Sequence, residues 1–545
     1  MTKRSIWLLP VVAFLTVHTD LSAQPTGASG DSSLLTALLA VVLLIAFFVI
    51  IQVSDNLLRI EAGKIGGEGP RQVSLFPGFR EMFRHRLPAW VNGPAYVLGK
   101  GFDIKLEGAA PPVVDQDARA LTFAVQPGDF RGLSPIPKLL VSEGDVVKAG
   151  DPLFFDKNQE AVRYVAPVSG EIVGIRRGER RSIREVVILA DKEQQYRSLP
   201  SLDLATASRE DLVSFLLDSG VWPMFRQRPF DVMADPQRIP DHIFVSTFDS
   251  APLAPDLDFV VQGSEAAFQQ GLDVLGRLTA GQVHLGLNAG GDTPPAKAFR
   301  EATGVQHHWF KGKHPAGNVG VQIHHIAPLG PGRCVWTMGV QEVITLGKLF
   351  TEQRFHAERL VALTGAELST TAYVRTFLGA NIGDLLKTRL PEGSTARIVS
   401  GDVLSGKQQS TAGFLGFHDD QLTVLREGNE YQLFGWLLPD LTSPSASRAL
   451  PGWVFPDSTY RADTNTKGEK RAFVVTGQYE EVLPMDIYPQ HLMKAILTNN
   501  YDRMEGLGIY ELIEEDVALC EFVCTSKQPL QQILRQGLDM VNEQG

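Results

Sequence analysis

The chain has 545 residues, too many for one hydrophobic core, which indicates three or four domains. Its hydrophobic content of 44% and charged content of 21% are ordinary for a globular protein, and its net charge of −11 argues against nucleic-acid binding, which needs a basic face. The three cysteines, Cys334, Cys520 and Cys524, exclude a disulfide framework and suit a reducing compartment.

Two apolar segments open the chain. Residues 1–23 combine a basic start, an apolar run and small residues near Ala23, which is the layout of a signal peptide. Residues 34–53 carry no charge and are long enough for one transmembrane helix. Basic residues follow in the juxtamembrane linker 54–95, so the positive-inside rule predicts a single-pass inner-membrane protein whose bulk is cytoplasmic. The alternative for either apolar segment is a buried core helix.

Residues 96–195 predict a lipoyl/biotinyl-like β half-barrel. Short apolar runs alternate with glycine-containing turns, at 138–141, 152–155, 162–166 and 171–175. We expect residues 96–108 to join this half-barrel. Lys157 lies near the turn in which carrier domains hold a modified lysine, but Asn158 and Gln159 do not match that context. An unmodified Lys157 is therefore favoured over a lipoylated one.

Residues 196–365 predict a Rossmann-like α/β domain with a parallel sheet. Helical and strand patterns alternate there, at 212–219, 242–246, 263–278 and 282–287. The loop Asn288–Asp292 follows a strand and could face an anion at the sheet edge, but it lacks the GxGxxG spacing. A structural role for this loop is favoured.

Histidines cluster at the end of this region, at His307, His308, His314, His324 and His325. A metal site is disfavoured because no HExxH motif is present, and because in a predicted strand His324 and His325 point to opposite faces. The loop 312–317 is more informative, because its lysine, histidine and glycines suit the lining of a small-molecule cleft.

Residues 366–445 predict a small β domain that also holds a helix at 381–386. Its expected strands lie at 396–400, 402–404, 414–417, 421–426 and 431–438, while 372–378 fits either a strand or a short helix. Residues 446–545 predict a C-terminal helical domain, in which the i,i+4 spacing of Cys520 and Cys524 places both thiols on one helix face. A four-iron cluster needs four thiolates, so this chain alone cannot hold one. A cluster or metal shared with another subunit is the remaining alternative.

Several short motifs, taken in their order along the chain, resemble one family. They are Gly99–Asp103, the half-barrel, Arg226–Phe230, Lys313–Gly317, Ser400–Leu404, Phe434–Trp436, Leu483–Asp486 and Glu514–Cys520. In this order they look like the A subunit of the sodium-translocating NADH:quinone oxidoreductase, over about residues 96 to 545. The signal-like segment and the membrane helix are additional to the usual start of that family.

The resemblance implies an α+β multidomain fold, in which the small β domain is β-grasp-like (SLBB-type). It implies a membrane complex that oxidises NADH, reduces a ubiquinone-type quinone and pumps sodium out of the cell. Within it, this chain is expected to be a cytoplasmic-facing scaffold or quinone-associated subunit that binds no cofactor and is not catalytic in isolation. NADH, flavins and iron–sulfur centres then belong to other subunits, and the expected partners are those subunits, especially the membrane-embedded B subunit, with quinone and the inner membrane.

A quinone site needs an apolar slot with one or two donors for the carbonyl oxygens. Loop context and chemistry select six candidate residues, Arg226, Arg228, Phe230, Lys313, His314 and Gly317. Two other functions stay open, namely a membrane-anchored lipoyl-domain adaptor and an NADH reductase subunit with its own flavin or cluster.

Overall fold

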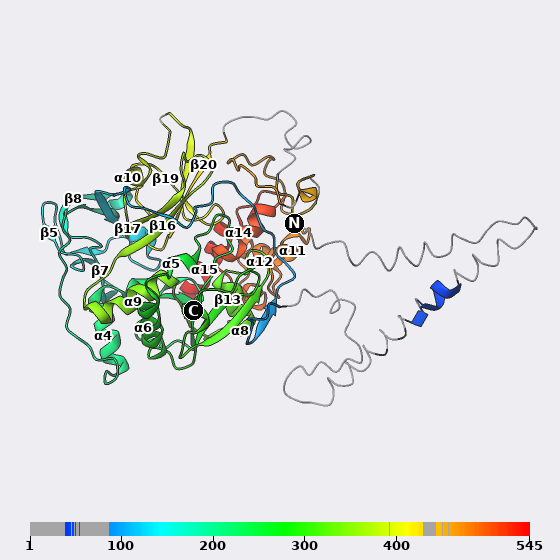
Figure 1. The fold of residues 1–545 in the computed structure, drawn as a ribbon, viewed down its shortest axis with the longest axis horizontal. Coiled ribbons are helices and arrows are strands. Elements are labelled where there is room, and N and C mark those ends of the chain that lie inside the picture. Colours follow the sequence, from blue (N-terminus) through cyan, green and yellow to red (C-terminus); the bar gives the residue numbers. More distant parts are fainter. Residues whose placement is uncertain are drawn as a thin grey trace, which may run out of the picture. The chain divides into compact units, whose positions relative to one another are not determined.

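The computed structural model describes residues 39–44, 46–47, 50, 54, 87–391, 393–428, 443–448, 451–455 and 457–544. The chain divides into two units, Met1–Leu87 and Pro88–Gly545. The expected signal peptide, most of the expected membrane segment and linker, and the expected strand at 431–438 lie outside the described residues. Of the helical residues that are described, none forms a helix with the length and apolar character needed to cross a bilayer. The second unit contains the β-strands that are labelled in Figure 1.

Two small antiparallel sheets form the barrel-like part, as the alternation of apolar runs and turns predicts. One has the order β3-β9-β8-β5 and the other β4-β6-β7. The strands are β3 (Thr122–Val125), β4 (Lys138–Leu139), β5 (Val146–Val147), β6 (Pro152–Asp156), β7 (Gln159–Val165), β8 (Gly170–Arg177) and β9 (Ile183–Ala190). Phe154 stacks on Tyr164 with ring centroids 4.8 Å apart, and both side chains are buried. Lys157 is exposed in the turn between β6 and β7.

A seven-stranded sheet with the order β1-β14-β13-β12-β15-β10-β11 forms the α/β part. Its strands are β1 (Ala95–Val97), β10 (Arg226–Arg228), β11 (Val232–Met233), β12 (His242–Ser246), β13 (Val283–Asn288), β14 (Gln306–Lys311) and β15 (Val335–Thr337). The expectation that residues 96–108 join the half-barrel is wrong, because β1 pairs in parallel with β14. Tyr96 stacks on Phe310 at 4.9 Å, so an aromatic contact across the ladder holds β1 at this edge.

Helices α4 (Arg209–Ser219), α5 (Leu257–Val260), α6 (Glu265–Gly276), α7 (Lys297–Arg300), α8 (Val319–Ile326) and α9 (Val340–Glu352) accompany this sheet. Gly271 and Gly347 let α6 and α9 approach closely: a Cβ on Gly347 would lie 1.8 Å from the Ala267 carbonyl oxygen. The expected strand at His324 and His325 is wrong, because both residues lie in α8. The run VGVQIHHI has helical amphipathicity that packs Val321 and Ile323 into the core.

A six-stranded sheet, ordered β19-β18-β20-β16-β17-β2, forms the small β domain. Its elements are β2 (Val114–Asp115), β16 (Glu358–Thr364), β17 (Ala372–Phe377), α10 (Ile382–Leu386), β18 (Ala396–Ser400), β19 (Lys407–Gln409) and β20 (Gln421–Arg426). The ambiguous segment 372–378 is therefore a strand. The expected strands at 402–404 and 414–417 are wrong. Asp402 accepts the backbone N–H groups of Leu404 and Ser405, which closes a turn, and Phe414 forms an isolated bridge.

The C-terminal part is helical, as expected, with α11 (Gln478–Val482), α12 (Pro489–Leu497), α13 (Tyr501–Gly506), α14 (Glu514–Val523) and α15 (Leu530–Gln544). Short 3-10 turns are η1 (Pro127–Asp129), η2 (Glu179–Arg181), η3 (Trp222–Met224), η4 (Pro451–Val454) and η5 (Ile509–Glu511). The thiols of Cys520 and Cys524 both contact Tyr479, through its carbonyl and its hydroxyl respectively, but α14 ends at Val523, so Cys524 follows the helix and does not lie on its face as predicted.

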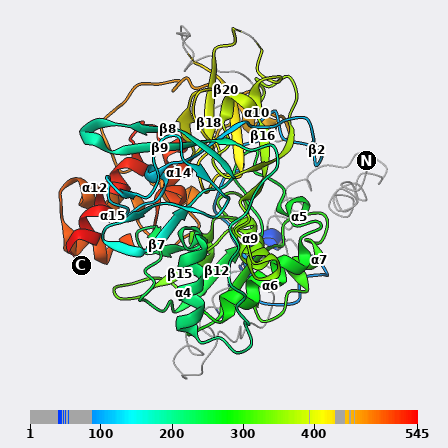
Figure 2. The same ribbon diagram turned by 90° about the vertical axis from the view of Figure 1, so that its left-hand side faces the viewer.

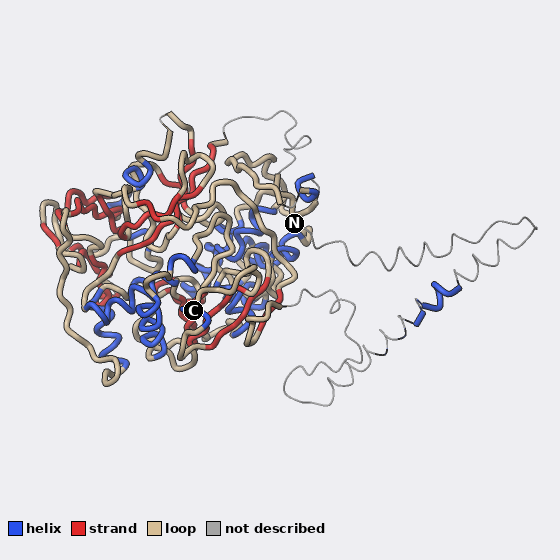
Figure 3. Tube along the Cα trace, viewed as in Figure 1, coloured by secondary structure: helices blue, strands red, loops and turns tan. Residues whose placement is uncertain are grey.

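Two hydrophobic clusters hold these parts together. One runs through the barrel, the α/β sheet and the six-stranded sheet, and the other joins the C-terminal helices to α8 and to Phe244. The six-stranded sheet and the α/β sheet lie on opposite sides of this unit in two perpendicular views (Figures 1 and 2). Long loops connect the elements between them (Figure 3). The packing thus brings loops from all four parts to one junction.

Candidate functional site

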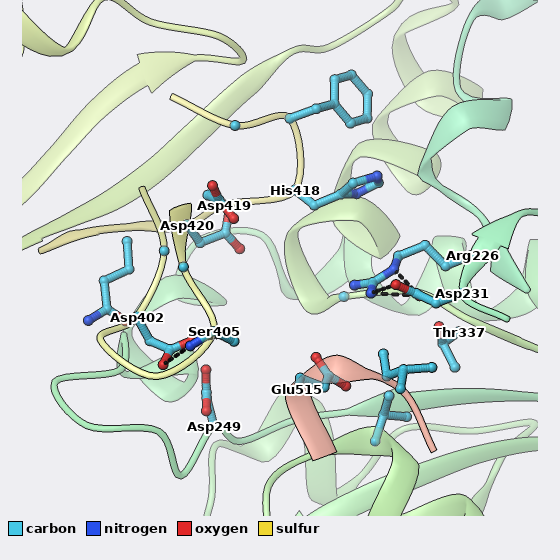
Figure 4. Close-up of a pocket in the computed structure, with 18 of the residues that line it drawn as sticks. Arg226, Asp231, Asp249, Thr337, Asp402, Ser405, His418, Asp419, Asp420 and Glu515 are labelled. Atoms are coloured by element: carbon cyan, nitrogen blue, oxygen red, sulfur yellow. Dashed lines mark hydrogen bonds and ion pairs between the residues drawn. The ribbon is translucent and has the colours of Figure 1, made fainter. Parts of the chain in front are cut away.

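A cavity of about 390 Å³ lies at this junction (Figure 4). Its lining comes from all four parts: the end of η1, strands β10 and β11, the turns around β18 and β20, and the start of α14. The volume is within the range that small-molecule sites occupy.

The cavity lies at the point where the order of the α/β sheet reverses. The chain passes from β12 to β13 and β14 on one side, then crosses to β15 on the other side of β12. Ser246 ends β12, Thr337 ends β15, and both line the cavity. Ligands of open α/β sheets bind at this kind of switch point, outside the carboxyl ends of the strands.

Acidic side chains dominate the polar lining. The cations are Arg131, Arg226 and Lys407, whereas the carboxylates are Asp129, Asp231, Asp249, Asp402, Asp419, Asp420, Glu514 and Glu515. Figure 4 shows Asp249, Asp402, Asp419 and Asp420 on one side and Arg226, Asp231 and His418 on the other. Even with some of the eight carboxyls protonated, the three cations leave no excess positive charge for the phosphates of a nucleotide, so this edge is poorly suited to a dinucleotide or a flavin nucleotide.

Arg226 is the candidate residue best placed for binding. Asp231 accepts hydrogen bonds from its Nε at 2.8 Å and its Nη2 at 2.7 Å, and Arg131 also reaches Asp231, at 2.7 Å. Burial alone would raise the pKa of Asp231, but Arg226 and Arg131 hold it below its usual range. Among the described residues, Nη1 of Arg226 has no hydrogen-bond partner. This clamped guanidinium therefore keeps a free donor at the cavity.

Arg228 is committed to the protein interior. Its side chain is 1% exposed and donates to Asp516 at 2.8 Å and to Glu515 at 2.7 Å. Phe230 packs edge-on against Tyr510, and its carbonyl accepts two hydrogen bonds from Arg535. Both residues therefore fasten the α/β part to the C-terminal helices, and neither lines the cavity.

The loop 312–317 contributes Gly317 to the cavity lining. A Cβ there would lie 2.6 Å from the Ser250 backbone nitrogen, so the close approach requires glycine. His314 is buried behind this wall, with Nδ1 3.1 Å from the Ser250 hydroxyl. Lys313 is exposed beside Phe102. Of the six candidates, the structure thus places Arg226 and Gly317 at one cavity and the other four outside its lining.

His418 lines the cavity and has no counterpart among the residues expected from the sequence. Within the described part of the chain, neither of its ring nitrogens has a hydrogen-bond partner. Burial, assisted by the charge of Arg226, lowers the pKa of His418 to about 3, so the imidazole is neutral. In the sequence, a histidine next to two aspartates is typical of a solvated loop. The sequence therefore contains no indication that His418 lines a cavity.

Some of the cavity carboxyls have a raised pKa, in contrast to Asp231. Burial raises the pKa of Asp419 to about 6, and burial together with Glu342 raises that of Asp420. The pKa of Glu515 is also raised by burial, although Arg228 opposes the shift. Carboxyls that bind protons near neutral pH in a cleft are typical of functional sites.

The histidines of the α/β sheet form a chain of hydrogen bonds. His284 Nδ1 lies 2.9 Å from His308 Nε2, and His284 Nε2 lies 3.1 Å from His242 Nδ1. The backbone N–H of Gln282 donates to that same His242 nitrogen at 3.2 Å. Nδ1 of His242 is therefore an acceptor, His284 donates to it, and His308 donates to His284.

The other histidines are also used within the fold. His324 Nδ1 lies 2.7 Å from Glu511, and His325 Nε2 donates to the Pro484 carbonyl at 2.9 Å. Among the described residues, no group of three or more His, Cys, Asp or Glu side chains is arranged to hold a metal ion. The loop Asn288–Asp292 is closed by its own Asn288 side chain and does not line the cavity.

The fold and the cavity define a multidomain α+β protein with a cavity where its domains meet. Three domain families match the chain: the NqrA N-terminal barrel-sandwich hybrid domain over residues 97–191, the NqrA second alpha/beta domain over 207–355, and the NqrA C-terminal, SLBB-type domain over 360–411. The chain belongs to the NqrA family, the A subunits of the Na(+)-translocating NADH-quinone reductase, as the full-length relatives show.

The NqrA proteins from Alcanivorax borkumensis and Yersinia pestis are 38% and 39% identical to it over 452 residues, which is 82% of this chain and 99% of each relative. The protein from Serratia proteamaculans is 38% identical over 456 residues. A solved NAD+-reducing NiFe-hydrogenase aligns with 43% of this chain and 52% of its own, at 14% identity and a TM-score of 0.29, from which we argue nothing.

Proposed function

We propose that this chain is the quinone-associated subunit of a sodium-translocating NADH:quinone oxidoreductase. It holds no redox centre of its own, and its partners carry the flavins and the iron–sulfur centre. Its relatives are named as the A subunit of that reductase, and the match covers 99% of their length. The observation that carries the quinone assignment is the junction cavity, with a free Arg226 donor beside apolar side chains such as Phe130 and Met338.

The chemistry of the cavity supports a neutral carbonyl ligand over a nucleotide. A quinone carries no charge, so the acidic wall does not repel it, whereas the same wall opposes a phosphate. The ring needs apolar surface and one or two donors for its oxygens, and Arg226 Nη1 is such a donor. An NADH reductase subunit with its own flavin is the less favoured function for the same reason.

Two experiments test the assembly of the chain into the complex, namely co-purification with a tagged chain and depletion of the chain from membranes. We expect an affinity-tagged chain to co-purify with the other reductase subunits, the membrane-embedded B subunit among them, and membranes lacking the chain to lose NADH-driven reduction of ubiquinone-1. Purification of a complete, active complex without this chain would contradict the proposal. An absorption spectrum of the isolated chain tests the missing redox centres, because a bound flavin or iron–sulfur cluster absorbs visible light.

The membrane attachment is a separate proposal. Residues 34–53 are uncharged and long enough to span the inner membrane once, with the basic linker on the cytoplasmic side. A carbonate wash of membranes should leave the full-length chain in the pellet and release a variant that lacks residues 34–53. Release of the full-length chain would contradict a spanning helix.

A further inference from the structure

His418 faces the same cavity as Arg226, and Figure 4 shows both on the side opposite the acidic wall. Each of the two residues keeps a polar group without a hydrogen bond within the described structure, as Asp420 also does at its Oδ1. Glu515 is held by Arg228 at 2.7 Å, and Lys407 lies 3.6 Å from Asp129. An uncommitted polar group beside a cavity is available to a ligand, and leaving it unpaired carries a cost in free energy.

The turn that carries His418 is fixed from both sides. The Gly416 N–H donates to the Ser400 hydroxyl at 2.9 Å, and the Phe417 N–H donates to Asp129 of the barrel at 3.0 Å. The Ser400 hydroxyl in turn donates to the Asp419 carboxylate at 2.6 Å. The imidazole is thus presented by a backbone that is already ordered, which lowers the entropy cost of using it in binding.

Aromatic side chains provide the apolar surface next to this imidazole. Phe417 lies edge-on to Phe130 with ring centroids 4.7 Å apart, and both line the cavity. Phe130 in turn packs on the buried ring of Tyr164 at 4.6 Å. A flat, uncharged ring with an oxygen at its edge fits this combination of aromatic surface and a single polar group.

We propose that His418 binds one ring oxygen of the quinone headgroup while Arg226 binds another; this rests on the proposed function of the cavity. A neutral imidazole has one donor and one acceptor nitrogen. It can therefore donate to a quinone carbonyl and accept from a quinol hydroxyl, whereas Arg226 only donates. Burial, which keeps His418 neutral, preserves both abilities across the physiological pH range.

The test uses calorimetry to measure the binding of ubiquinone-1 to the full-length chain in detergent. His418→Phe keeps an aromatic ring without nitrogen and should raise the Kd about tenfold, whereas His418→Gln keeps an N–H donor and should stay within about threefold. Arg226→Gln is the reference for the cavity, and His314→Ala is the matched control, because His314 lies behind the wall and should bind like wild type. Thermal unfolding midpoints verify that each variant is folded.

The outcomes separate the two proposals. A loss in Arg226→Gln with none in His418→Phe, or equal losses in His418→Gln and His418→Phe, would overturn the role of His418 and leave the cavity as the site. Unchanged binding in both Arg226→Gln and His418→Phe, or no binding by wild type, would overturn the quinone site itself. If His418→Phe does not fold, infrared spectra of bound, carbonyl-labelled ubiquinone-1 decide between the outcomes. The carbonyl band should be shifted in wild type and less shifted in His418→Gln. An identical band position in wild type and His418→Gln would overturn the contact.

Discussion

Two polar regions of this protein differ in how their histidines are paired. In the α/β sheet, His242, His284 and His308 bond to one another on three adjacent strands, although Nδ1 of His308 has no partner among the described residues. At the domain junction, His418 lies among carboxylates with no hydrogen bond in the described structure. Polar groups that satisfy each other stabilise the fold, whereas groups held unpaired beside a cavity are available to a ligand. The pattern of partners thus distinguishes a structural histidine from a binding one.

The largest difference is expected between two neighbouring arginines of β10. Arg228→Ala leaves Asp516, which is fully buried, without its cation and should lower the free energy of unfolding by about 3–5 kcal/mol. Arg226→Ala removes a side chain that is 33% exposed and should cost clearly less. Urea unfolding followed by tryptophan fluorescence measures both. Equal losses of free energy would show that the Arg228–Asp516 pair and the Arg226–Asp231 pair contribute equally to stability.

The histidines provide the next comparison. His284→Ala leaves the His308 N–H without its acceptor and opens a small cavity, whereas His242 Nδ1 keeps the Gln282 N–H, so we expect a loss of about 2–3 kcal/mol. His418→Ala removes no hydrogen bond and should cost less than about 1 kcal/mol. The two variants are compared by thermal and urea unfolding under the same conditions. A larger loss in His418→Ala would reverse the assignment of roles.

The smallest effect is a change in the pH dependence of stability, which has opposite signs for His284 of the sheet and Asp419 of the cavity. Burial and the neighbouring histidines lower the pKa of His284 to about 3, so its stabilising effect is complete above about pH 6.5 and is lost as the pH falls toward 3. Burial raises the pKa of Asp419 to about 6, so the folded state gains stability as the pH falls from about 6 toward 4.

Each group changes the slope of stability against pH by at most about 1.4 kcal/mol per pH unit. His284→Phe should therefore flatten the loss of stability on acidification, and Asp419→Asn should make it steeper. Unfolding midpoints between pH 5 and pH 8 provide the measurement, and His418→Ala should flatten the loss as His284→Phe does, because the pKa of His418 is also lowered to about 3. Slopes that change in the same direction in the first two variants would contradict these signs.

Local pattern was enough for most regular elements of the second unit. The alternation of apolar runs and glycine turns predicted β6, β7 and β8 within a few residues, and helical periodicity predicted α4 and α6. At His324 and His325 the expected strand was wrong, and tertiary packing formed α8 instead. The motif order was also enough to indicate the family, because it depends on the residues alone.

The sequence by itself determined the family and strongly periodic elements such as β6 and α6, since these follow from motif order and local spacing. The tertiary structure decided that β1 joins the α/β sheet, because strand partners far apart in the chain are chosen by packing. It also decided the site: it buried Arg228 in an ion pair 288 residues away in the chain and left Arg226 at the cavity. His418 meets Arg226 there only because loops from separate domains converge, which no local pattern records.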